Sequence, residues 1–391
     1  MILDTSFPPD PRVENEALSL LKAGHEVHLF SLCYENRKKF EVINGIKVHR
    51  YKGNKLTYKL SALAYTIPIY EWLVIPKLKK FISKNRIEVL HVHDMLIAQA
   101  VMRANKSFRL KIILDLHENR PEIMKYYPHL NKFPGNILIN INKWTRKQNE
   151  LIMKTDKLIL VTEEAKEVAL GAVSGLRNED VVVVPNAVAL DIFNNYGIES
   201  KIIRKYADCF VILYVGDTSL RRGTDTAIKA IDLLKSKISN IMLVMVGKNS
   251  EDNKLRRLIT TLKLEDFVSM EGWQDFSLFP SYITASDICI SPLKRNPHHD
   301  TTYANKIFQY MAMKKPIIVS DCPAQENIVN LEKCGLVFEA ENEQDLATKI
   351  LKLYNSPSLK SMLEKNAILA IGSKYNWEIT SKALIRLYNN L

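Results

Sequence analysis

Short apolar runs rich in β-branched residues recur along this chain, and stretches with helical periodicity separate them. Clear examples are VVVV at residues 181–184, ILYV at 212–215, LVMV at 243–246 and PIIV at 316–319. A strand that is apolar on both faces belongs to a parallel sheet that helices cover on each side. The alternation therefore predicts an α/β protein built from doubly wound parallel sheets.

The strand patterns fall into two series. We expect five strands in the first, at residues 27–31, 89–92, 111–115, 157–161 and 181–184, and six in the second, at 210–215, 241–246, 268–270, 288–291, 316–320 and 336–338. A chain of 391 residues favours two domains over one. Apolar periodicity lapses over residues 194–204, so we predict Rossmann-like domains at 1–195 and 196–374, followed by a helix at 375–391.

Composition narrows the possible partners and surroundings. The net charge of +12 suggests an anionic partner, which is a nucleotide, a nucleic acid or a membrane surface. The basic residues are spread along the chain without a recognition module, which disfavours nucleic acid. There is no apolar run of roughly 20 residues, no signal-peptide pattern and no CxxC among the five cysteines. We therefore expect a cytoplasmic protein with reduced thiols and no structural zinc.

Glycine and arginine follow the first strand of the second series. The chain has no GxGxxG, and its first strand-to-helix turn reads Pro-Pro-Asp-Pro at residues 8–11, which argues against a nicotinamide dehydrogenase. After residues 210–215 comes Gly216, which permits close backbone approach, and then Arg221 and Arg222. A guanidinium pairs with two phosphate oxygens, so this loop is a candidate diphosphate site. The alternative is a solvated basic loop.

A second candidate phosphate site lies in residues 290–320, which read as strand, polar loop, helix and strand. We expect the helix to run from a cap at Thr301 or Thr302 to about Met313, with Asn305 and Lys306 in its first turn. Helix starts at the carboxyl ends of parallel strands bind anions. The alternative is an ordinary crossover helix. In a doubly wound sheet this loop and the Gly216 loop open on the same edge.

Taken together, these segments resemble the retaining glycosyltransferases of family 4. The resemblance rests on FPPDPRVENEALSLLKAGHEV at residues 7–27, LDLHENRPEI at 114–123, VVVVPNAVALDIF at 181–193, YVGDTSLRRG at 214–223, TTYANKIFQYMAMKKPIIVSD at 301–321 and a final helix that contains Trp377. It implies the two-domain GT-B fold, with the final helix crossing back to the first domain. It also implies a UDP- or GDP-sugar donor in a cleft, a glycan or lipid-linked acceptor, and a role in surface polysaccharide synthesis.

The resemblance also assigns site residues. His117 matches a catalytic histidine that contacts the transferred sugar, and we expect its imidazole to be neutral. Arg222 matches the basic residue that holds the diphosphate, and Trp273 falls where the family borders the base, although burial in the core is an equal alternative. Together with Lys306, the arginines would neutralise the leaving group, so no metal and no cofactor is expected. In the family, the leaving phosphate takes the acceptor proton.

The chain departs from the family pattern at three positions. Thr301 and Gln309 stand where the family usually has glutamates, which contact the sugar and the ribose. Gln309 can still accept a hydrogen bond but carries no charge. Asp217 stands where many members have an arginine, so Arg221 would replace that contact. An alternative is therefore a catalytically silent GT-B protein that binds a sugar nucleotide or a partner enzyme.

Three other features carry weaker hypotheses. His91, His93 and Asp94 have metal-ligand types, but the sequence indicates no further ligand, so we favour a polar cluster at a strand end. His298 and His299 are expected in a solvated loop beside the donor. Lysines 52, 55, 59, 77, 79 and 80 flank an apolar segment with Tyr65, Ile67, Ile69, Tyr70 and Trp72. This segment is either a surface for an anionic membrane or a core-facing helix with solvated lysines.

Overall fold

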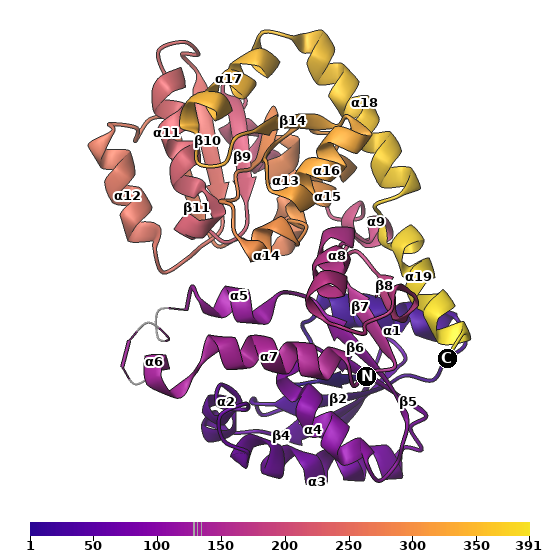
Figure 1. The fold of residues 1–391 in the computed structure, drawn as a ribbon. Coiled ribbons are helices and arrows are strands. Elements are labelled where there is room, and N and C mark those ends of the chain that lie inside the picture. Colours follow the sequence, from indigo (N-terminus) through magenta and orange to yellow (C-terminus); the bar gives the residue numbers. More distant parts are fainter. Residues whose placement is uncertain (128–129, 131, 134) are drawn as a thin grey trace. The chain divides into compact units, whose positions relative to one another are not determined.

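A computed structural model of the chain describes residues 1–127, 130, 132, 133 and 135–391. The described residues form two compact units (Figure 1). Unit 1 comprises Met1–Pro185 and Ser381–Leu391, and unit 2 comprises Asn186–Thr380. These divisions differ from the predicted ones after residues 195 and 374. The reason is that Phe193 packs in the core of unit 2 and Val188 forms a β-bridge with Asn376.

Unit 1 contains an eight-stranded sheet in the order β3-β4-β2-β1-β5-β6-β7-β8. Its strands are β1 (Ile2–Leu3), β2 (His28–Cys33), β3 (Phe40–Ile43), β4 (Ile46–Lys52), β5 (Val89–His93), β6 (Lys111–Leu116), β7 (Lys157–Leu160) and β8 (Val181–Val183). All neighbours are parallel except β3 and β4, which form a hairpin around Asn44 and Gly45, both with positive φ. The five expected strands are present, and β1, β3 and β4 are additional.

The helices of unit 1 cover both faces of this sheet. They are α1 (Pro11–Lys22), α2 (Lys55–Ser61), α3 (Ile69–Lys84), α4 (Met95–Asn105), α5 (Arg120–Met124), α6 (Gly135–Leu138), α7 (Ile141–Ile152), α8 (Glu163–Ala172) and the 3₁₀ turn η2 (Asn178–Asp180). Helix α1 begins where Asp10 accepts a hydrogen bond from the Val13 N–H and Pro11 supplies a preset φ. This cap turns the chain away from β1 and starts the helix at the carboxyl edge of the sheet.

Unit 2 contains a six-stranded, fully parallel sheet in the order β11-β10-β9-β12-β13-β14. Its strands are β9 (Phe210–Val215), β10 (Ile241–Val246), β11 (Val268–Gly272), β12 (Ile288–Ser291), β13 (Ile317–Ser320) and β14 (Gly335–Phe338), at all six expected places. Counted along the chain, this order is 3-2-1-4-5-6, the Rossmann arrangement. The strand order reverses between β9 and β12, so the loops that follow these two strands flank the crevice in which such sheets bind ligands.

Helices pack on each face of the unit 2 sheet and form two separate apolar clusters. They are α9 (Leu190–Phe193), α10 (Ser200–Lys205), η3 (Leu220–Arg222), α11 (Thr224–Leu234), α12 (Asp252–Thr261), η4 (Phe276–Leu278), α13 (Phe279–Thr284), α14 (Pro297–Asp300), α15 (Lys306–Ala312), α16 (Pro323–Glu332), α17 (Glu343–Tyr354) and α18 (Pro357–Ser373). The last helix, α19 (Trp377–Asn389), begins in unit 2 and belongs to unit 1 from Ser381 onward. Figure 1 shows α11 and α17 together on one side of the sheet. Among the described helices, none is long and apolar enough to cross a bilayer.

The helix predicted from Thr301 or Thr302 to Met313 is wrong at its start. Residues 297–300 form the single turn α14, Thr301 ends that turn, and α15 begins only at Lys306. Asn305 precedes α15 without a side-chain hydrogen bond to the helix. Neither threonine caps α15, because the Thr301 hydroxyl donates to the Pro297 carbonyl instead.

We expect Gly335→Ala to destabilise unit 2. A methyl group there would lie 2.2 Å from the Ile317 carbonyl oxygen on the neighbouring strand β13. Such crowding should cost about 1–3 kcal/mol. The matched control is Gly372→Ala in α18, where no atom lies within 4 Å of the new methyl group. Alanine should stabilise that helix by a few tenths to about 1 kcal/mol. Equal melting temperatures for the two variants would contradict this account.

Candidate active site

Three glycines let the loops of unit 2 meet at the carboxyl edge of its sheet. Gly216 follows β9 with φ +120°, and a methyl group on Gly247, after β10, would lie 1.8 Å from the Gly216 carbonyl oxygen. Gly223 has φ +71°, and its methyl group would lie 1.6 Å from the carbonyl oxygen of Pro292, after β12. Only glycine permits these approaches. The β9 loop is therefore pressed against both neighbouring loops.

The predicted arginines sit on this loop with a carboxylate between them. Asp217 Oδ2 lies 3.5 Å from Arg221 Nη2 and 3.8 Å from Arg222 Nε. Burial acts to raise the pKa of Asp217, but hydrogen bonds from Ser219 and the charges of the two arginines outweigh it and lower the pKa. Asp217 therefore stays ionised and offsets part of the loop's positive charge. It is not a phosphate ligand, in contrast to the arginine that many family members carry there.

Lys306 reaches back to the same loop from the start of α15. Its Nζ lies 3.5 Å from the centre of the Tyr214 ring, and a methyl group on Gly216 would lie 3.3 Å from it. A cation over an aromatic face is attracted by the ring quadrupole. Burial and the charge of Arg222 lower the pKa of Lys306 well below its usual range, while Asp217 acts in the opposite direction. An anion bound at this place would favour the charged ammonium.

The two histidines before α15 are buried, although we expected a solvated loop. His299 Nε2 lies 3.2 Å from Arg221 Nη1, and His298 Nδ1 lies 3.3 Å from the Thr302 hydroxyl. Burial lowers the pKa of each histidine to about 3, and the two arginines add to the effect. Both imidazoles are therefore neutral. α14 folds them inward because its first turn is capped by Asn296, which accepts a hydrogen bond from the His299 N–H.

The remaining predicted residues of unit 2 occupy different settings. Thr301 is buried with its hydroxyl engaged in α14, and Gln309 is buried one turn after Lys306 in α15. Asn305 is exposed. Trp273 is 71% exposed and follows Gly272, so the alternative of a core tryptophan is wrong. The structure thus brings Gly216, Arg221, Arg222 and Lys306 together and leaves Trp273 as an exposed ring at the end of β11.

His117 lies in unit 1, directly after β6, among acidic partners. Its Nε2 is 3.0 Å from Asp115 Oδ2 and 3.2 Å from His93 Nδ1, and its Nδ1 is 3.7 Å from Asp94 Oδ2. Burial acts to lower the pKa of His117, but Asp94 and Asp115 outweigh it and raise the pKa to about 9. The expected neutral imidazole is therefore wrong, because two carboxylates hold the proton on the ring at neutral pH.

A buried arginine organises the carboxylates beneath His117. Arg12, from α1, donates to both oxygens of Asp115, at 3.2 and 3.0 Å, and lies 3.0 Å from Glu16 Oε1. Burial would raise the pKa of Asp115, but Arg12 and His117 hold it well below its usual range. Burial and the negative charge of Asp115 raise the pKa of Glu16 well above its usual range. Asp115 therefore stays ionised between the two cations of Arg12 and His117.

The same cluster contains further residues of metal-ligand type, which the sequence did not indicate beside His91 and His93. One ligand atom from each of Glu16, His91, His93 and Asp115 lies within 4.8 Å of the others, so further potential metal ligands are present after all. Burial lowers the pKa of both histidines. However, the Arg12 guanidinium already contacts both carboxylates and supplies the positive charge that a metal ion would bring. The geometry therefore fits a guanidinium-centred polar core.

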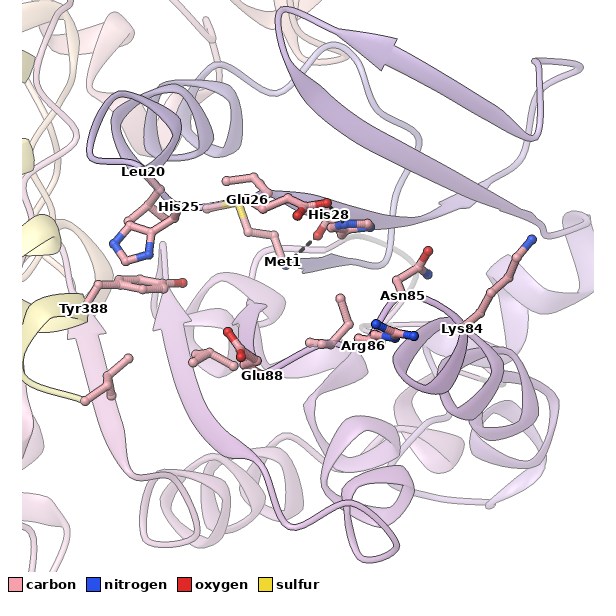
Figure 2. Close-up of a pocket in the computed structure, with 14 residues that line it drawn as sticks. Met1, Leu20, His25, Glu26, His28, Lys84, Asn85, Arg86, Glu88 and Tyr388 are labelled. Carbon is pink, nitrogen blue, oxygen red and sulfur yellow. Dashed lines mark hydrogen bonds and ion pairs between the residues drawn. The ribbon is translucent and has the colours of Figure 1, made fainter.

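A pocket of about 690 Å³ lies elsewhere in unit 1, and Figure 2 shows the residues that line it. Its lining includes Met1, His28, Glu88 and Arg86, with Tyr388 from the last helix. Met1, His28 and Glu88 stand at the amino ends of β1, β2 and β5, whereas His117 follows the carboxyl end of β6. This pocket is therefore separate from the candidate catalytic groups. Tyr388 also lies with its hydroxyl 2.9 Å from His91 Nδ1, which ties the last helix to β5.

Family profiles match both halves of the chain. The profile described as Glycosyltransferase Family 4 matches residues 12–192, and the profile described as Glycosyl transferases group 1 matches residues 197–369. The chain therefore belongs to glycosyltransferase family 4, and it is a transferase of the GT-B type.

Curated relatives share this family at low identity. An uncharacterised glycosyltransferase of Methanocaldococcus jannaschii is 21% identical over 62% of this chain and 60% of that protein, so the match spans less than two thirds of its length. An uncharacterised glycosyltransferase of Haemophilus influenzae is 23% identical over 91% of this chain and 89% of its own. The lipopolysaccharide core biosynthesis glycosyltransferase LpsD of Rhizobium meliloti is 24% identical over 47% of this chain and 50% of its own.

Solved structures share the fold. Sucrose-phosphate synthase from Thermosynechococcus elongatus has a TM-score of 0.79 at 18% identity, covering 99% of this chain and 94% of that one. Anabaena HepE, solved in complex with UDP, has a TM-score of 0.73 at 15% identity, covering 100% and 99%. At these identities the likeness establishes the GT-B fold alone.

The sequence did not indicate several members of the polar cluster beneath His117. Arg12 and Asp115 are two of them, although Asp115 is the one acidic residue in an otherwise apolar run, IILDL at 112–116. Such a charge requires a partner, because a buried carboxylate is unstable alone. Tyr388 gave no comparable signal, since its contact with His91 joins positions far apart in sequence.

We expect His117 to stabilise the protein in a pH-dependent way. The folded pKa of about 9 is above the value near 6.5 of an unfolded histidine. The stabilisation is therefore complete below about pH 6.5 and is lost as the pH rises through about 9. In urea unfolding followed by circular dichroism, the free energy of unfolding of the wild type should exceed that of His117→Gln by about 3 kcal/mol at pH 6 and by little above pH 9.5. An equal difference at both pH values would contradict the assigned charge.

Proposed function

We propose that this chain transfers a sugar from a UDP- or GDP-sugar to a glycan or lipid-linked acceptor, with retention of the anomeric configuration. The observation that carries the proposal is the gathering of Arg221, Arg222 and Lys306 around the Gly216 turn, at the strand-order reversal of unit 2. UDP bound to the structurally similar HepE supports a uridine nucleotide. The relative LpsD supports a place in surface polysaccharide synthesis.

In the proposed reaction, the bond between the sugar anomeric carbon and the diphosphate oxygen breaks. Negative charge then grows on the leaving diphosphate, and cationic groups already in place stabilise it without reorganising. Arg221 and Arg222 supply these charges, and Lys306 adds its charge once the bound anion favours the ammonium form. The acceptor oxygen bonds to the anomeric carbon on the same face, and its proton passes to the leaving diphosphate oxygen. Trp273 offers an exposed ring for the base, and Gln309 an acceptor for the ribose.

His117 acts in this proposal as a hydrogen-bond donor to the transferred sugar. Its Nδ1 lies 3.7 Å from Asp94 Oδ2, beyond hydrogen-bond length, so the N–H can turn to a sugar hydroxyl. The ring is cationic, but Asp94 and Asp115 flank it. Their charge offsets the repulsion between an imidazolium and an oxocarbenium-like carbon. Thr301 replaces the family's first glutamate, so the sugar contact of that residue falls to other groups.

Mutations should separate donor binding from the chemistry of the sugar. Arg222→Ala removes one charge-assisted phosphate contact, which should lower kcat/KM by roughly 10²–10³-fold, equal to about 2–4 kcal/mol. His117→Ala should lower kcat by about 10²-fold and leave the UDP or GDP Kd nearly unchanged. Turnover is measured as hydrolysis of UDP-glucose and GDP-mannose without acceptor, and affinity by calorimetry. Circular dichroism verifies folding.

The same assay separates the active enzyme from the silent alternative. A catalytically silent protein would be stabilised by UDP or GDP, by about 2.7 kcal/mol at 100 times the Kd, but would release no nucleotide from any sugar donor. The proposal fails if the wild-type protein neither binds UDP or GDP nor hydrolyses their sugars. Normal kcat in His117→Ala would remove this residue from the active site.

We further propose that unit 1 contacts an anionic lipid surface, where a lipid-linked acceptor would reside. Tyr65 and Tyr70 are core residues, which supports the core-facing alternative for that part of the segment. Trp72, however, is 63% exposed in α3, and further large apolar side chains of α2, α3 and residues 133–138 are exposed as well; we call this set the apolar patch. Its members are the exposed side chains of Leu56, Tyr58, Ile69, Trp72, Leu73, Phe133, Ile137 and Leu138.

Two observations favour a lipid partner for this patch. A hydrogen bond from the Thr66 hydroxyl to the Leu138 carbonyl joins the α2–α3 connection to α6, so the two parts of the patch are linked. Exposed Lys55 and Lys59 lie among the apolar side chains of α2. Aromatic side chains bordered by lysine suit the interface of an anionic bilayer.

We expect the protein to sediment with vesicles that contain phosphatidylglycerol, more weakly as salt is raised, and not with vesicles of pure phosphatidylcholine. Trp72→Ala should weaken binding about tenfold or more, since a buried side chain of this size contributes roughly 1.5–3 kcal/mol. The control is Leu331→Ala in α16, a side chain 69% exposed outside the patch. Equal binding by the two variants would exclude this surface.

A further inference from the structure

We propose that Asp217 and His299 are positioning residues that hold the guanidinium of Arg221 in place for the diphosphate of the donor. The inference rests on the proposed function, because it assigns supports to a phosphate ligand of that site. Asp217 stands where many family members have an arginine, and His299 lies in a loop that we had expected to be solvated. Neither residue needs to touch the donor in this role.

His299 accepts a hydrogen bond from one end of the Arg221 guanidinium. Arg221 Nη1 lies 3.2 Å from His299 Nε2 and can only donate, so Nε2 must accept. The ring proton therefore sits on Nδ1, which lies 2.8 Å from the Lys294 carbonyl oxygen and donates to it. The Asn296 side-chain oxygen accepts a hydrogen bond from the His299 N–H and caps α14, which holds the backbone of His299. Backbone contacts thus fix the ring, and the ring fixes Arg221.

Asp217 forms an ion pair with the other end of the Arg221 guanidinium. Its Oδ2 lies 3.5 Å from Arg221 Nη2, and its carboxylate is itself anchored by three shorter bonds. These are from Asn249 Nδ2 at 2.7 Å, the Ser219 N–H at 3.1 Å and the Ser219 hydroxyl at 2.9 Å. Because neutral donors from two loops hold the carboxylate, its position does not depend on the arginine. Arg221 therefore has a fixed acceptor at each terminal nitrogen.

Asp217 has two opposed effects on donor binding. The direction in which nucleotide affinity changes when Asp217 is neutralised shows which effect is larger. A fixed acceptor reduces the conformational entropy that Arg221 loses on binding phosphate, which strengthens donor binding. A carboxylate near phosphate also repels it, which weakens binding. The anchoring of Asp217 by Asn249 and Ser219, together with the charge of Arg222 beside it, favours the first effect. Neutralising Asp217 should then weaken nucleotide binding.

A double-mutant cycle tests the role of His299. UDP and GDP affinities are measured by calorimetry for wild type, Arg221→Ala, His299→Ala and the double variant. His299→Ala should weaken nucleotide binding about tenfold, which is the change expected for the loss of one hydrogen bond to a charged group. If His299 acts through Arg221, the double variant should bind within about twofold of Arg221→Ala alone. Additive losses would show that His299 does not act through Arg221.

Conservative variants guard against a folding defect, since His299 is buried. His299→Gln offers an amide oxygen to Arg221 Nη1 and should restore most of the lost affinity. If His299→Gln binds UDP and GDP no better than His299→Ala does, while both keep the wild-type circular dichroism spectrum, then the lost affinity does not come from a lost hydrogen-bond acceptor. Asp217→Asn keeps the size and the acceptor oxygen but removes the charge, and it should weaken nucleotide binding about fivefold. Tighter binding would overturn the role of Asp217.

The outcome also distinguishes this inference from the proposed function. If Arg221→Ala, Arg222→Ala and Lys306→Ala all leave the UDP and GDP affinities unchanged, the diphosphate binds elsewhere and the proposed donor site fails. If those variants weaken binding but His299→Ala and Asp217→Asn do not, the donor site stands and the positioning roles are wrong.

Discussion

The turns after β9, β10 and β12 touch backbone to backbone at the carboxyl edge of unit 2, and the candidate donor site depends on this contact. The approach of Gly247 to Gly216, and of Gly223 to Pro292, leaves no room for even one methyl group. Because the turns are locked together, the side chains that they carry converge. Arg221 and Arg222 come from the β9 turn, and His299 and Lys306 from the segment after β12.

Converging cations repel one another, and each unit offsets its charges locally. In unit 2, Asp217 lies beside both arginines, and the Tyr214 ring lies under Lys306. In unit 1, the situation is inverted, since buried carboxylates gather and the cations of Arg12 and His117 offset them. The consequence differs as well. Unit 2 retains positive charge suited to an anion, whereas His117 in unit 1 gains a proton that its sequence context did not indicate.

Elements with strong local patterns could be predicted from the sequence, and elements set by tertiary contact could not. All eleven expected strands are present, because runs such as VVVV and ILYV suit a covered parallel sheet whatever surrounds them. Strand β1, of two residues, has too short a pattern, and the hairpin strands β3 (FEVI) and β4 (IKVHRYK) lack the continuous apolar run of a covered strand. The helix start at Thr301 failed because α14 takes up the threonine hydroxyl, a local alternative that the cap rule does not exclude.

The sequence by itself determined the α/β class, the two series of strands, the Gly216 turn with its arginines and the family that these motifs resemble. These features depend on residue type and on neighbours close along the chain. The tertiary structure alone decided that Asp217 and His299 face Arg221, that Arg12 lies against Asp115, and that His117 holds its proton. The physical reason is that electrostatic energy depends on distance and burial, and both are fixed by contacts between residues up to about a hundred positions apart, as in the pairing of Arg12 with Asp115.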